Sequence, residues 1–412
     1  MGGKKKIAIF TEFYPFGAGE EFLEDEIKVA ERFFDEIALI SFNKETDNVT
    51  KYIPKNAIVI PIKKRISQRT IQLKRILGLF SLDVWKQTFL CIWERGLNSL
   101  IEGMKSAIIE HSVVSVLKAA EGSWIGKYDI FYSYWLSGAA SYLAARKKQL
   151  GGVLISRAHG YDCFFERGFH PHRTEQLQNL DMIFPISDAG REDLVRQGGD
   201  PDKIQIARLG VEKPNDKVNL FKKTGTKRIV TCSNIIELKR LDLLIEALSL
   251  INSVRIEWVH FGDGALREEI ERLAKQILSE KKDISYTFMG RVQLNRIFEY
   301  YESESIDYFI NCSDVEGIPV SIMEAMSYGI PCIARDVGGI REIVENGVNG
   351  FLLPRECTAE ILSNEILQAL NMSENERLMI RSEAFRKFID MYNAETNYPH
   401  FWKTILKDSS IF

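Results

Sequence analysis

Two glutamates, Glu316 and Glu324, stand eight positions apart in the stretch EGIPVSIMEAMSYGIPCIARDVGG, residues 316–339. Pro319 suits the first turn of a helix, where its missing N–H costs little, and Gly329 suits the helix end. This pattern places Glu316 in a loop after a buried strand and Glu324 over a turn into a helix. Ionised carboxylates beside the free N–H groups of a helix start can bind hydroxyls and anions. The hydroxyls of a sugar or ribose are therefore candidate ligands; the alternative is two solvated glutamates.

A second stretch, SNIIELKRLDLLIEAL at 233–248, places Lys239 and Arg240 at the start of a predicted helix. A cation at a helix N-terminus is electrostatically unfavourable unless an anion lies nearby. This position favours an anion-binding role for Lys239 over that of an ordinary surface lysine.

Polar and glycine residues also follow two predicted strands of the N-terminal half. His159 and Asp162 lie in ISRAHGYDCFFERGF, at the carboxyl end of a strand, and this cluster favours a functional site. Gly17 and Gly19, in TEFYPFGAGEEF, permit close backbone approach. A tight strand-to-helix turn explains these glycines equally well, and the G-x-G-x-x-G dinucleotide fingerprint is absent.

Short apolar runs alternate with amphipathic helical patterns along the chain, which predicts parallel sheets covered by helices on both faces. The hydrophilic stretch EKPNDKVNLFKKTGTK, 212–227, is interpreted as a linker. The fold class expected is α/β, with two doubly wound domains, and ligands should bind at the carboxyl ends of the strands, in the cleft where the two sheets face each other. The expected division is 1–212, 213–393 and a terminal helix at 394–412. Trp402 and Ile405 form the expected packing face of that helix.

Composition excludes several classes of protein. The 412 residues carry a net charge of −3, so no global basic field indicates nucleic acid. Six scattered cysteines without a C-x-x-C pair are typical of free thiols in a reducing compartment. His170 and His172 are interpreted as loop residues, and no ligand spacing indicates a metal. With no long apolar run to span a bilayer, the chain is expected to be cytoplasmic.

A helical insertion is expected at about 62–118. In IKKRISQRTIQLKRILGLF, 62–80, apolar side chains share one helical face and every charge is positive; Trp85, Phe89 and Trp93 continue the apolar pattern. A basic amphipathic segment with aromatic neighbours predicts binding to an anionic membrane surface through 62–100. The alternative is an insertion that packs on its own domain and shows its charges to water.

The stretch from 316 onward, continued by DVGGIREIVENGVNGFLL, resembles the signature of glycosyltransferase family 4, the glycosyl transferases group 1. The resemblance implies a GT-B fold and retaining sugar transfer. It implies that Glu316 contacts donor-sugar hydroxyls and that Glu324 holds the ribose of the nucleotide. The N–H groups of Gly317, Ile318 and Val320 would face the sugar and diphosphate.

The same resemblance implies further roles. Lys239 matches a phosphate-binding lysine of the family, whereas Asn234 stands where an arginine is usual, so Arg240 or another cation would have to substitute. Arg291 and Val292 would border the base.

In the N-terminal half, the resemblance implies that Gly17 and Gly19 face the donor phosphates and that His159 contacts the donor sugar. Asp162 is a candidate for orienting an acceptor hydroxyl.

The expected function is retaining transfer of a hexose from a UDP- or GDP-sugar to a saccharide or lipid-linked saccharide, in bacterial surface polysaccharide or glycoconjugate biosynthesis. The nucleotide sugar is a co-substrate, and neither a cofactor nor a metal is expected. A family 4 phosphorylase and a non-catalytic partner-binding relative remain alternatives. Nucleotide-sugar epimerases share the GT-B fold but resemble the chain less, and a nicotinamide dehydrogenase is disfavoured.

Overall fold

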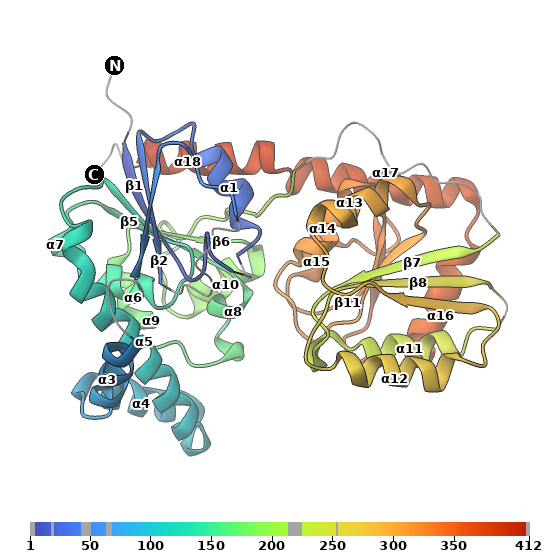
Figure 1. The fold of residues 1–412 in the computed structure, drawn as a ribbon, viewed down its shortest axis with the longest axis horizontal. Helices are drawn as coiled ribbons and strands as arrows, with labels where there is room; N and C mark the ends of the chain where they lie inside the picture. The colour runs from blue at the N-terminus through green and yellow to red at the C-terminus, as the bar shows by residue number, and fades with distance from the viewer. Residues whose placement is uncertain are drawn as a thin grey trace. The chain divides into compact units, whose positions relative to one another are not determined.

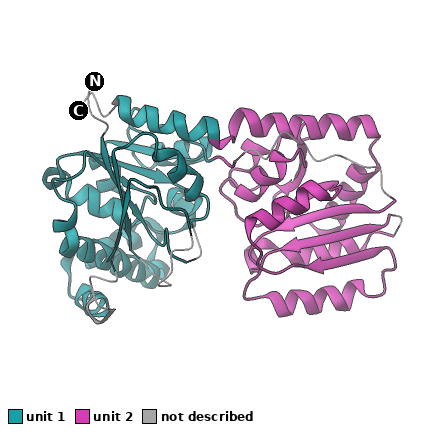
Figure 2. Cartoon of the chain, turned by 45° about the horizontal axis from the view of Figure 1, so that its top comes forward, with its two compact units in different colours: residues 1–209, 395–412 teal, residues 210–394 magenta. Residues whose placement is uncertain are grey.

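The computed structural model describes residues 5–17, 20–42, 51–62, 68–212, 225–252 and 254–408. The chain forms two compact units (Figure 2): unit 1 comprises residues 1–209 and 395–412, and unit 2 comprises residues 210–394. Each unit contains one six-stranded sheet, and the paired strands run parallel in both. The expected α/β class with two doubly wound domains is confirmed.

The sheet of unit 1 has the order β3-β2-β1-β4-β5-β6 (Figure 1). Its strands are β1 (Lys6–Thr11), β2 (Glu36–Ser41), β3 (Ala57–Pro61), β4 (Ile130–Ser133), β5 (Val153–Ala158) and β6 (Met182–Pro185). In a doubly wound sheet of this order, the chain reverses direction between the first and fourth strands, and ligands bind there. Every residue of β4, β5 and β6 is buried, as expected of parallel strands covered on both faces.

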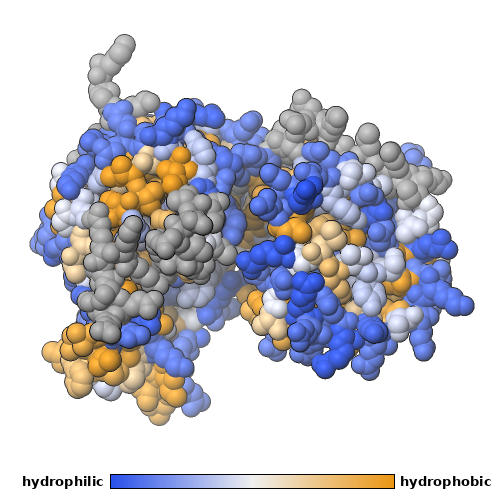
Figure 3. Space-filling view, viewed as in Figure 1, coloured by the Kyte–Doolittle hydropathy of each residue, from blue (hydrophilic) through white to orange (hydrophobic). Residues whose placement is uncertain are grey.

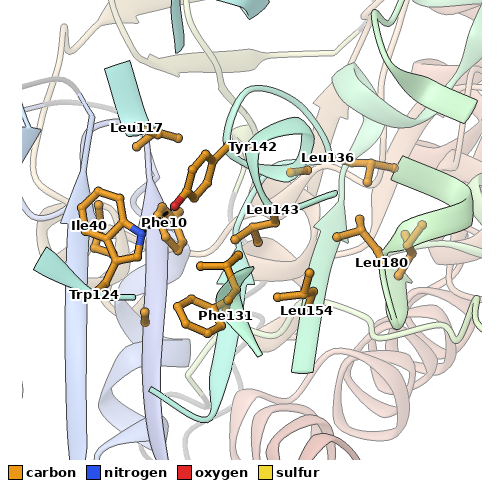
Figure 4. Packing of buried hydrophobic residues seen from close by; sticks show 14 of the residues in the cluster. Phe10, Ile40, Leu117, Trp124, Phe131, Leu136, Tyr142, Leu143, Leu154 and Leu180 are labelled. Carbon is orange, nitrogen blue, oxygen red and sulfur yellow. Dashed lines mark hydrogen bonds between the residues drawn. The ribbon is translucent and has the colours of Figure 1, made fainter. Parts of the chain in front are cut away.

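One face of this sheet packs against helices that follow β3, β4, β5 and β6. They are α5 (Leu100–Ala120), α6 (Ala139–Ala145), α7 (Lys147–Leu150), α8 (Gly160–Cys163), α9 (Arg173–Asn179) and α10 (Asp188–Arg196). The core between them contains Phe10, Trp124 and Tyr142 (Figure 4), whose rings meet edge to face or tilted. The Trp124 indole N–H donates to the Tyr142 hydroxyl at 3.0 Å, so this buried polar pair is satisfied.

The opposite face of the unit 1 sheet is covered by α1 (Leu23–Ala30) and α18 (Ala394–Asp408). The last helix of the chain therefore belongs to the first sheet. Trp402 and Ile405 are buried; the Trp402 ring meets Phe34 and Tyr132 edge to face. The Trp402 indole donates to the Glu26 carbonyl at 3.3 Å. The expected packing face of the terminal helix is therefore a core element of unit 1.

Unit 2 repeats the same topology with the order β12-β11-β10-β7-β8-β9. Its strands are β7 (Lys227–Cys232), β8 (Ile256–Phe261), β9 (Ile284–Phe288), β10 (Tyr308–Asn311), β11 (Cys332–Arg335) and β12 (Gly350–Leu353). Its helices are α11 (Leu241–Ser249), α12 (Arg267–Leu278), α13 (Leu294–Ser303), α14 (Val320–Ser327), α15 (Ile340–Ile343), α16 (Ala359–Asn371) and α17 (Glu374–Met391). Local signals start two of them: the side chains of Thr358 and Ser373 cap α16 and α17.

The apolar alternation of KIQIARLG, 203–210, predicts a further strand in this half of the chain, and that prediction is wrong. These residues form only an isolated bridge between Ile204 and Ile183. Its backbone runs beside β6 and exchanges a few hydrogen bonds with it, including Gln205 N–H to the Ile183 carbonyl at 3.0 Å. The segment lies at the outer edge of the sheet, where pairing on one side only leaves the ladder irregular. Most of the predicted linker, 213–224, lies outside the described residues.

The insertion between β3 and β4 consists of α3 (Gln68–Gly78), α4 (Leu82–Arg95) and α5. Ile62 is fully buried, but Leu73, Leu77 and Phe80 are exposed, and so are Trp85, Phe89 and Trp93. Figure 3 shows the apolar patch at the lower left, over α3 and α4. Ile71, Val84 and Cys91 of the same helices are buried, so the insertion packs on its own domain and also leaves an apolar surface exposed; both interpretations of the segment stay open. Lys63, Lys64, Arg65 and the side chain of Arg69 lie outside the described residues.

Within the described ranges, no single helix is both long and apolar enough to cross a membrane. Residues 71–78 of α3 and helix α4 pass that test only as a pair, and they are bent by 61°.

His172 attaches α4 to α9, and the spacing of residues in the sequence gave no sign of its carboxylate partners. Its Nε2 lies 3.3 Å from Asp83 of α4, and its Nδ1 lies 3.2 Å from Glu175. Burial lowers the pKa of His172, but the hydrogen bond to Asp83 and the charges of Asp83, Glu110 and Glu175 outweigh it and raise the pKa above its usual value. A raised folded pKa means that this contact stabilises α4 at low pH and loses strength as pH rises through that pKa.

We therefore expect α4 to loosen from unit 1 as pH rises above about 6.5, the ordinary pKa of histidine. Amide hydrogen exchange of residues 82–95, corrected for intrinsic exchange rates, should show less protection at alkaline than at mildly acidic pH. The variant His172→Gln cannot titrate and should show the same corrected protection at both. Equal protection of the wild-type helix across this range would contradict the role of His172.

Candidate functional site

The predicted donor-binding residues of unit 2 all follow the carboxyl ends of strands in one parallel sheet. Lys239 comes after β7, Arg291 after β9, and Glu316 after β10. Because the strands are parallel, these ends share one edge of the sheet. That edge is where doubly wound sheets bind ligands.

Glu316 and Lys239 form an ion pair at this edge. The Lys239 ammonium donates to Glu316 Oε1 at 2.5 Å, and the Asn311 amide donates to the same oxygen at 3.3 Å. Glu316 is largely buried, whereas the Lys239 side chain is 22% exposed. The two residues come from neighbouring strands, β10 and β7. A carboxylate acceptor and a cation are therefore held side by side, the two groups needed to bind sugar hydroxyls and phosphate.

The Gly-Gly turn at 338–339 supports the Glu316 loop. A Cβ on Gly338 would lie 1.9 Å from the Glu316 carbonyl oxygen, and Gly338 has a positive φ of 55°. The Gly339 N–H donates to the Gly317 carbonyl at 2.9 Å. Only glycine fits so close to another backbone at this dihedral angle, so this turn fixes the position of the Glu316 backbone.

Helix α14 begins beside Glu316, as the sequence predicted. Pro319 is its N-cap, and the helix ends at Ser327, followed by Gly329 with a φ of 67°. No described residue accepts a hydrogen bond from the N–H of Gly317, Ile318 or Val320. The helix start therefore presents free N–H groups, which favour an anion.

Glu324 lies on α14 and is largely buried. Its charge and that of Lys239 both act on the Cys232 thiol at the carboxyl end of β7. Burial, reinforced by Glu324 and opposed by Lys239, raises the pKa of this thiol to about 12. Glu324, Lys239 and Glu316 thus lie together around the ends of β7 and β10.

The structure gives Arg240 and Asn234 less obvious roles. The Arg240 guanidinium donates to Asp242 at 3.0 Å and to Asp314 at 3.4 Å, so two carboxylates already engage it. Asn234 is exposed, and its side chain makes no hydrogen bond to any residue that the structure describes. Among the predicted cations, Lys239 is therefore the one placed directly against Glu316.

Arg291 and Val292 follow β9, the edge strand on the other side of the sheet. Three strand spacings of about 4.8 Å separate β9 from β10. An isolated bridge between Gly262 and Gly290 connects their loop to the end of β8. Their role beside the base stays a prediction.

His159 of unit 1 is buried at the end of β5. Its ring lies 4.5 Å from that of Trp135 and 4.8 Å from that of Tyr134. Neither ring nitrogen has a hydrogen-bond partner among the described residues. Burial, reinforced by the charge of Arg157, holds the pKa of His159 well below its usual value, so the imidazole is neutral. A neutral ring with two unused nitrogens can donate one hydrogen bond and accept another.

Asp162 is held by the backbone. Its Oδ1 accepts the His159 N–H at 2.6 Å, and its Oδ2 accepts the Leu136 N–H at 2.5 Å. Burial raises the pKa of Asp162 to about 6, although the two amide hydrogen bonds lower it. Its visible role is to join the loop after β4 to the loop after β5; its role with an acceptor stays a prediction.

Gly17 lies in the loop after β1 with a φ of 73°, and Gly19 lies outside the described residues. Glu20, which the sequence analysis did not single out, organises this loop. The Glu20 carboxylate accepts the N–H groups of Glu12, Phe13 and Tyr14 at 2.7–2.9 Å. It also accepts the Trp135 indole N–H at 2.7 Å. The position of Glu20 directly after the Gly-Ala-Gly run was the only signal available.

A buried ion pair lies close to His159 in the core of unit 1. Arg157, two residues earlier on β5, is fully buried and lies 2.8 Å from Glu26 Oε2. Its guanidinium also donates to the Tyr132 hydroxyl at 3.0 Å and lies 4.4 Å from the Phe401 ring centroid. The signal in the sequence was a single arginine in an apolar strand, but its partners come from β4, α1 and α18.

Two doubly wound sheets, with candidate residues at the carboxyl ends, define the GT-B fold, which solved structures share. Sucrose-phosphate synthase of Thermosynechococcus elongatus superposes with a TM-score of 0.72 at 16% identity, over 99% of this chain and 100% of that one. HepE of Anabaena, solved with UDP and glucose, gives 0.66 at 17% identity, over 98% and 100%. At these identities the likeness shows the fold alone.

Residues 212–387 match the family described as Glycosyl transferases group 1. The matched residues lie in unit 2. WcaL of Salmonella typhimurium, a glycosyltransferase named for colanic acid biosynthesis, is 27% identical over 283 residues, 65% of this chain and 68% of WcaL. The amylovoran biosynthesis glycosyltransferase AmsK of Erwinia amylovora is 26% identical over 284 residues, 66% of this chain and 68% of AmsK.

Proposed function

We propose that the protein is a retaining, family 4 glycosyltransferase that moves a hexose from a UDP- or GDP-sugar to a saccharide or lipid-linked saccharide. The observation that carries this proposal is the pairing of Lys239 with Glu316 beside the free N–H groups at the start of α14. Glu316 would bind hydroxyls of the donor sugar, and Glu324 would bind the ribose. Lys239 and the N–H groups of Gly317, Ile318 and Val320 would bind the diphosphate.

The proposed chemistry is substitution on one face of the sugar. The bond from the anomeric carbon to the phosphate oxygen breaks, the acceptor oxygen bonds to the same carbon, and the departing phosphate takes the acceptor proton. Lys239 and the amide groups stabilise the charge that develops on the phosphate. We propose that no divalent metal is required, so activity should persist in EDTA. His159, neutral and unpaired among the described residues, is proposed to contact the donor sugar.

Thermal unfolding with a panel of nucleotides tests the donor site. A ligand at 100 times its dissociation constant should stabilise the folded state by about 2.7 kcal/mol. We expect UDP or GDP, and the corresponding nucleotide sugars, to shift the unfolding of unit 2, while ADP and NAD do not. In Glu324→Ala the shift should disappear, because the buried carboxylate that would hold the ribose is removed.

The panel also separates the alternatives. If none of the nucleotides shifts the unfolding of unit 2, the result would contradict the transferase and favour a non-catalytic binding protein. The exposed, uncharged Asn234 is compatible with such a protein. Formation of a hexose 1-phosphate from a disaccharide and phosphate would indicate a phosphorylase.

We propose a role in bacterial surface polysaccharide or glycoconjugate biosynthesis, at the cytoplasmic face of the membrane. The support is the likeness to WcaL and AmsK, both named for extracellular polysaccharides. The exposed apolar face of α3 and α4 supports peripheral membrane binding, because water-exposed patches of this kind mark interaction surfaces. The cations Lys74, Arg75 and Lys86 lie on the same helices, which favours an anionic lipid surface over an apolar protein partner.

Vesicle flotation tests this surface. Phe89 is 63% exposed and Trp93 is 88% exposed. Burying one such side chain contributes about 1.5–3 kcal/mol, so Phe89→Ser/Trp93→Ser should weaken binding to phosphatidylglycerol vesicles by roughly a hundredfold or more. Met379→Ser, at a site on α17 that is 68% exposed, is the matched control and should bind like the wild type. Equal flotation of both variants would contradict the membrane surface.

A further inference from the structure

Glu20 has a backbone conformation that favours glycine. Its φ is 55°, in the left-handed region, where the Cβ of most other residues crowds the following carbonyl oxygen. The residue is also only 3% exposed, although glutamates are seldom buried unless strong partners hold them. Backbone strain of this kind persists where the surroundings over-determine it, and it clusters at functional sites. The partners of this carboxylate therefore indicate what the strained position is needed for.

The Glu20 carboxylate joins two loops that follow neighbouring strands. Its oxygens accept the N–H groups of three consecutive residues after β1, at 2.7–2.9 Å. Its Oε1 also accepts the indole N–H of Trp135, in the loop after β4, at 2.7 Å. Strands β1 and β4 pair directly. The bonds to the backbone explain the fold of the first loop, but the bond to the indole reaches a side chain outside it and needs a different explanation.

Trp135 is held at both its backbone and its ring. Its carbonyl accepts the hydroxyl of Ser133 at 2.6 Å and that of Ser156 at 3.2 Å, which attaches its backbone to β4 and β5. Its indole N–H is bound by Glu20. The ring is thus fixed in one position, where its centroid lies 4.5 Å from that of the His159 ring at an interplanar angle of 46°.

The orientation of the His159 ring depends on aromatic packing. Its backbone N–H donates to Asp162 at 2.6 Å, but neither ring nitrogen bonds to any residue in the described ranges. Three rings surround it, with centroids at 4.5 Å for Trp135, 4.8 Å for Tyr134 and 5.8 Å for Phe22. The Tyr134 hydroxyl has no partner among the described residues, and a phenyl ring has no polar atom. Trp135 is therefore the nearest of the three rings and the one that a hydrogen bond holds.

We propose that Glu20 is a positioning residue for sugar transfer, which acts by holding the Trp135 indole against the His159 imidazole. This hydrogen bond sets the plane of the imidazole and so the directions in which its two unused nitrogens point. The inference rests on the proposed function, because there His159 contacts the donor sugar. A hydrogen bond weakens steeply as its angle departs from linear, so a rotated imidazole would lose its contact with a sugar hydroxyl.

Nuclear magnetic resonance of the free protein, with isotope-labelled histidine, tests the positioning itself. Asparagine tolerates a left-handed φ but is one methylene shorter, so Glu20→Asn keeps the backbone conformation and loses the contact with Trp135. Because the His159 ring lies in the ring current of Trp135, its resonances should move in this variant. They should stay in place in the matched control Glu21→Asn, at the exposed neighbouring position. The resonances of His260, in unit 2, should stay in place in both.

Hydrolysis of nucleotide sugars, with water as the acceptor, measures the consequence for the reaction. The probes are UDP-glucose, UDP-galactose and GDP-mannose, and release of the nucleoside diphosphate gives the rate. A small misplacement of a reacting group costs up to about a hundredfold in rate, and we expect Glu20→Asn to lower kcat about tenfold. Its KM should stay within a few-fold of the wild type, because the proposed nucleotide contacts are unchanged. Glu21→Asn should retain the wild-type kcat.

Two further variants separate positioning from a purely structural role. Trp135→Phe keeps an aromatic ring and all the backbone hydrogen bonds of Glu20, so it tests the same path even if Glu20→Asn unfolds its loop. It should lower kcat in the same direction. In a protein that already carries His159→Ala, Glu20→Asn and Trp135→Phe should each have no further effect on kcat, because residues that act through one group are not additive.

Two results would overturn the proposal. One is a set of His159 resonances in Glu20→Asn that coincides with the wild type. The other is a loss of kcat by the same factor with and without His159, which would leave Glu20 only the role of folding its loop. Failure of the proposed function has a different signature: no nucleotide shifts the unfolding of unit 2 and no nucleotide sugar is cleaved, while the His159 resonances of Glu20→Asn still move.

Discussion

Replacing Glu316 with glutamine is expected to lower kcat/KM for sugar transfer about a hundredfold, while UDP or GDP binding stays within a few-fold of the wild type. Each hydrogen bond to a charged group contributes about 1.5–3 kcal/mol, and the carboxylate would accept from two sugar hydroxyls. Losing about 3 kcal/mol of binding to the reacting sugar corresponds to roughly a hundredfold in rate. The measurement is release of nucleoside diphosphate at varied nucleotide-sugar concentration.

The ion pair with Lys239 supplies the controls. Lys239→Met should weaken binding of the nucleoside diphosphate itself, because the lysine rather than the glutamate is assigned to phosphate. The effects of the two single variants should not add in the double variant, since the two groups are in contact at 2.5 Å. Glu246→Gln, at an exposed position on α11, should retain full activity. If Glu316→Gln retains the kcat/KM of the wild type, Glu316 does not belong to the donor site.

Replacing Glu26 with leucine is expected to lower the free energy of unfolding of unit 1 by about 3–5 kcal/mol, the usual cost of leaving a buried charge unpaired. Arg157 and Glu26 are both fully buried, so water cannot take the place of the lost carboxylate. For a unit of this size, that change corresponds to a fall in Tm on the order of 10 °C. Calorimetry should show the shift in the transition of unit 1 only.

The paired replacement Glu26→Leu/Arg157→Met distinguishes charge from packing. Removing both charges leaves no unpaired ion, so most of the lost stability should return. If the double variant is as unstable as the single one, the shape of the salt bridge, rather than its charge balance, supports unit 1. Nucleotide binding by unit 2 should remain in both variants.

Patterns within a short stretch of sequence predicted most of the fold. Buried parallel strands read as continuous apolar runs, and Pro319 and Gly329 set the ends of α14 because their backbone preferences are local. The segment 203–210 has the same apolar alternation but sits at the sheet edge, and edge position is not encoded in the alternation. The attachment of α4 through His172 depends on Asp83, which is distant in sequence.

The candidate site could be predicted from the sequence where its residues lie in one continuous stretch of the chain. Glu316, Glu324 and the glycine turn lie within a few turns of chain, and family resemblance assigned their roles. The ion pair of Glu316 with Lys239 needed the neighbouring positions of β10 and β7, which only the sheet order provides.

The return of α18 to the first sheet has a consequence for biosynthesis. Residues 1–209 are synthesised before unit 2, but the helix that buries Trp402 and covers Arg157 with Phe401 is synthesised only after it. Translation of the residues between takes roughly 10–40 s at about 5–20 residues per second. During that interval unit 1 exposes the apolar face reserved for α18, while unit 2 can complete its own core. The nascent N-terminal half is therefore expected to depend on chaperones, and truncation before α18 should destabilise unit 1 even though residues 1–209 are intact.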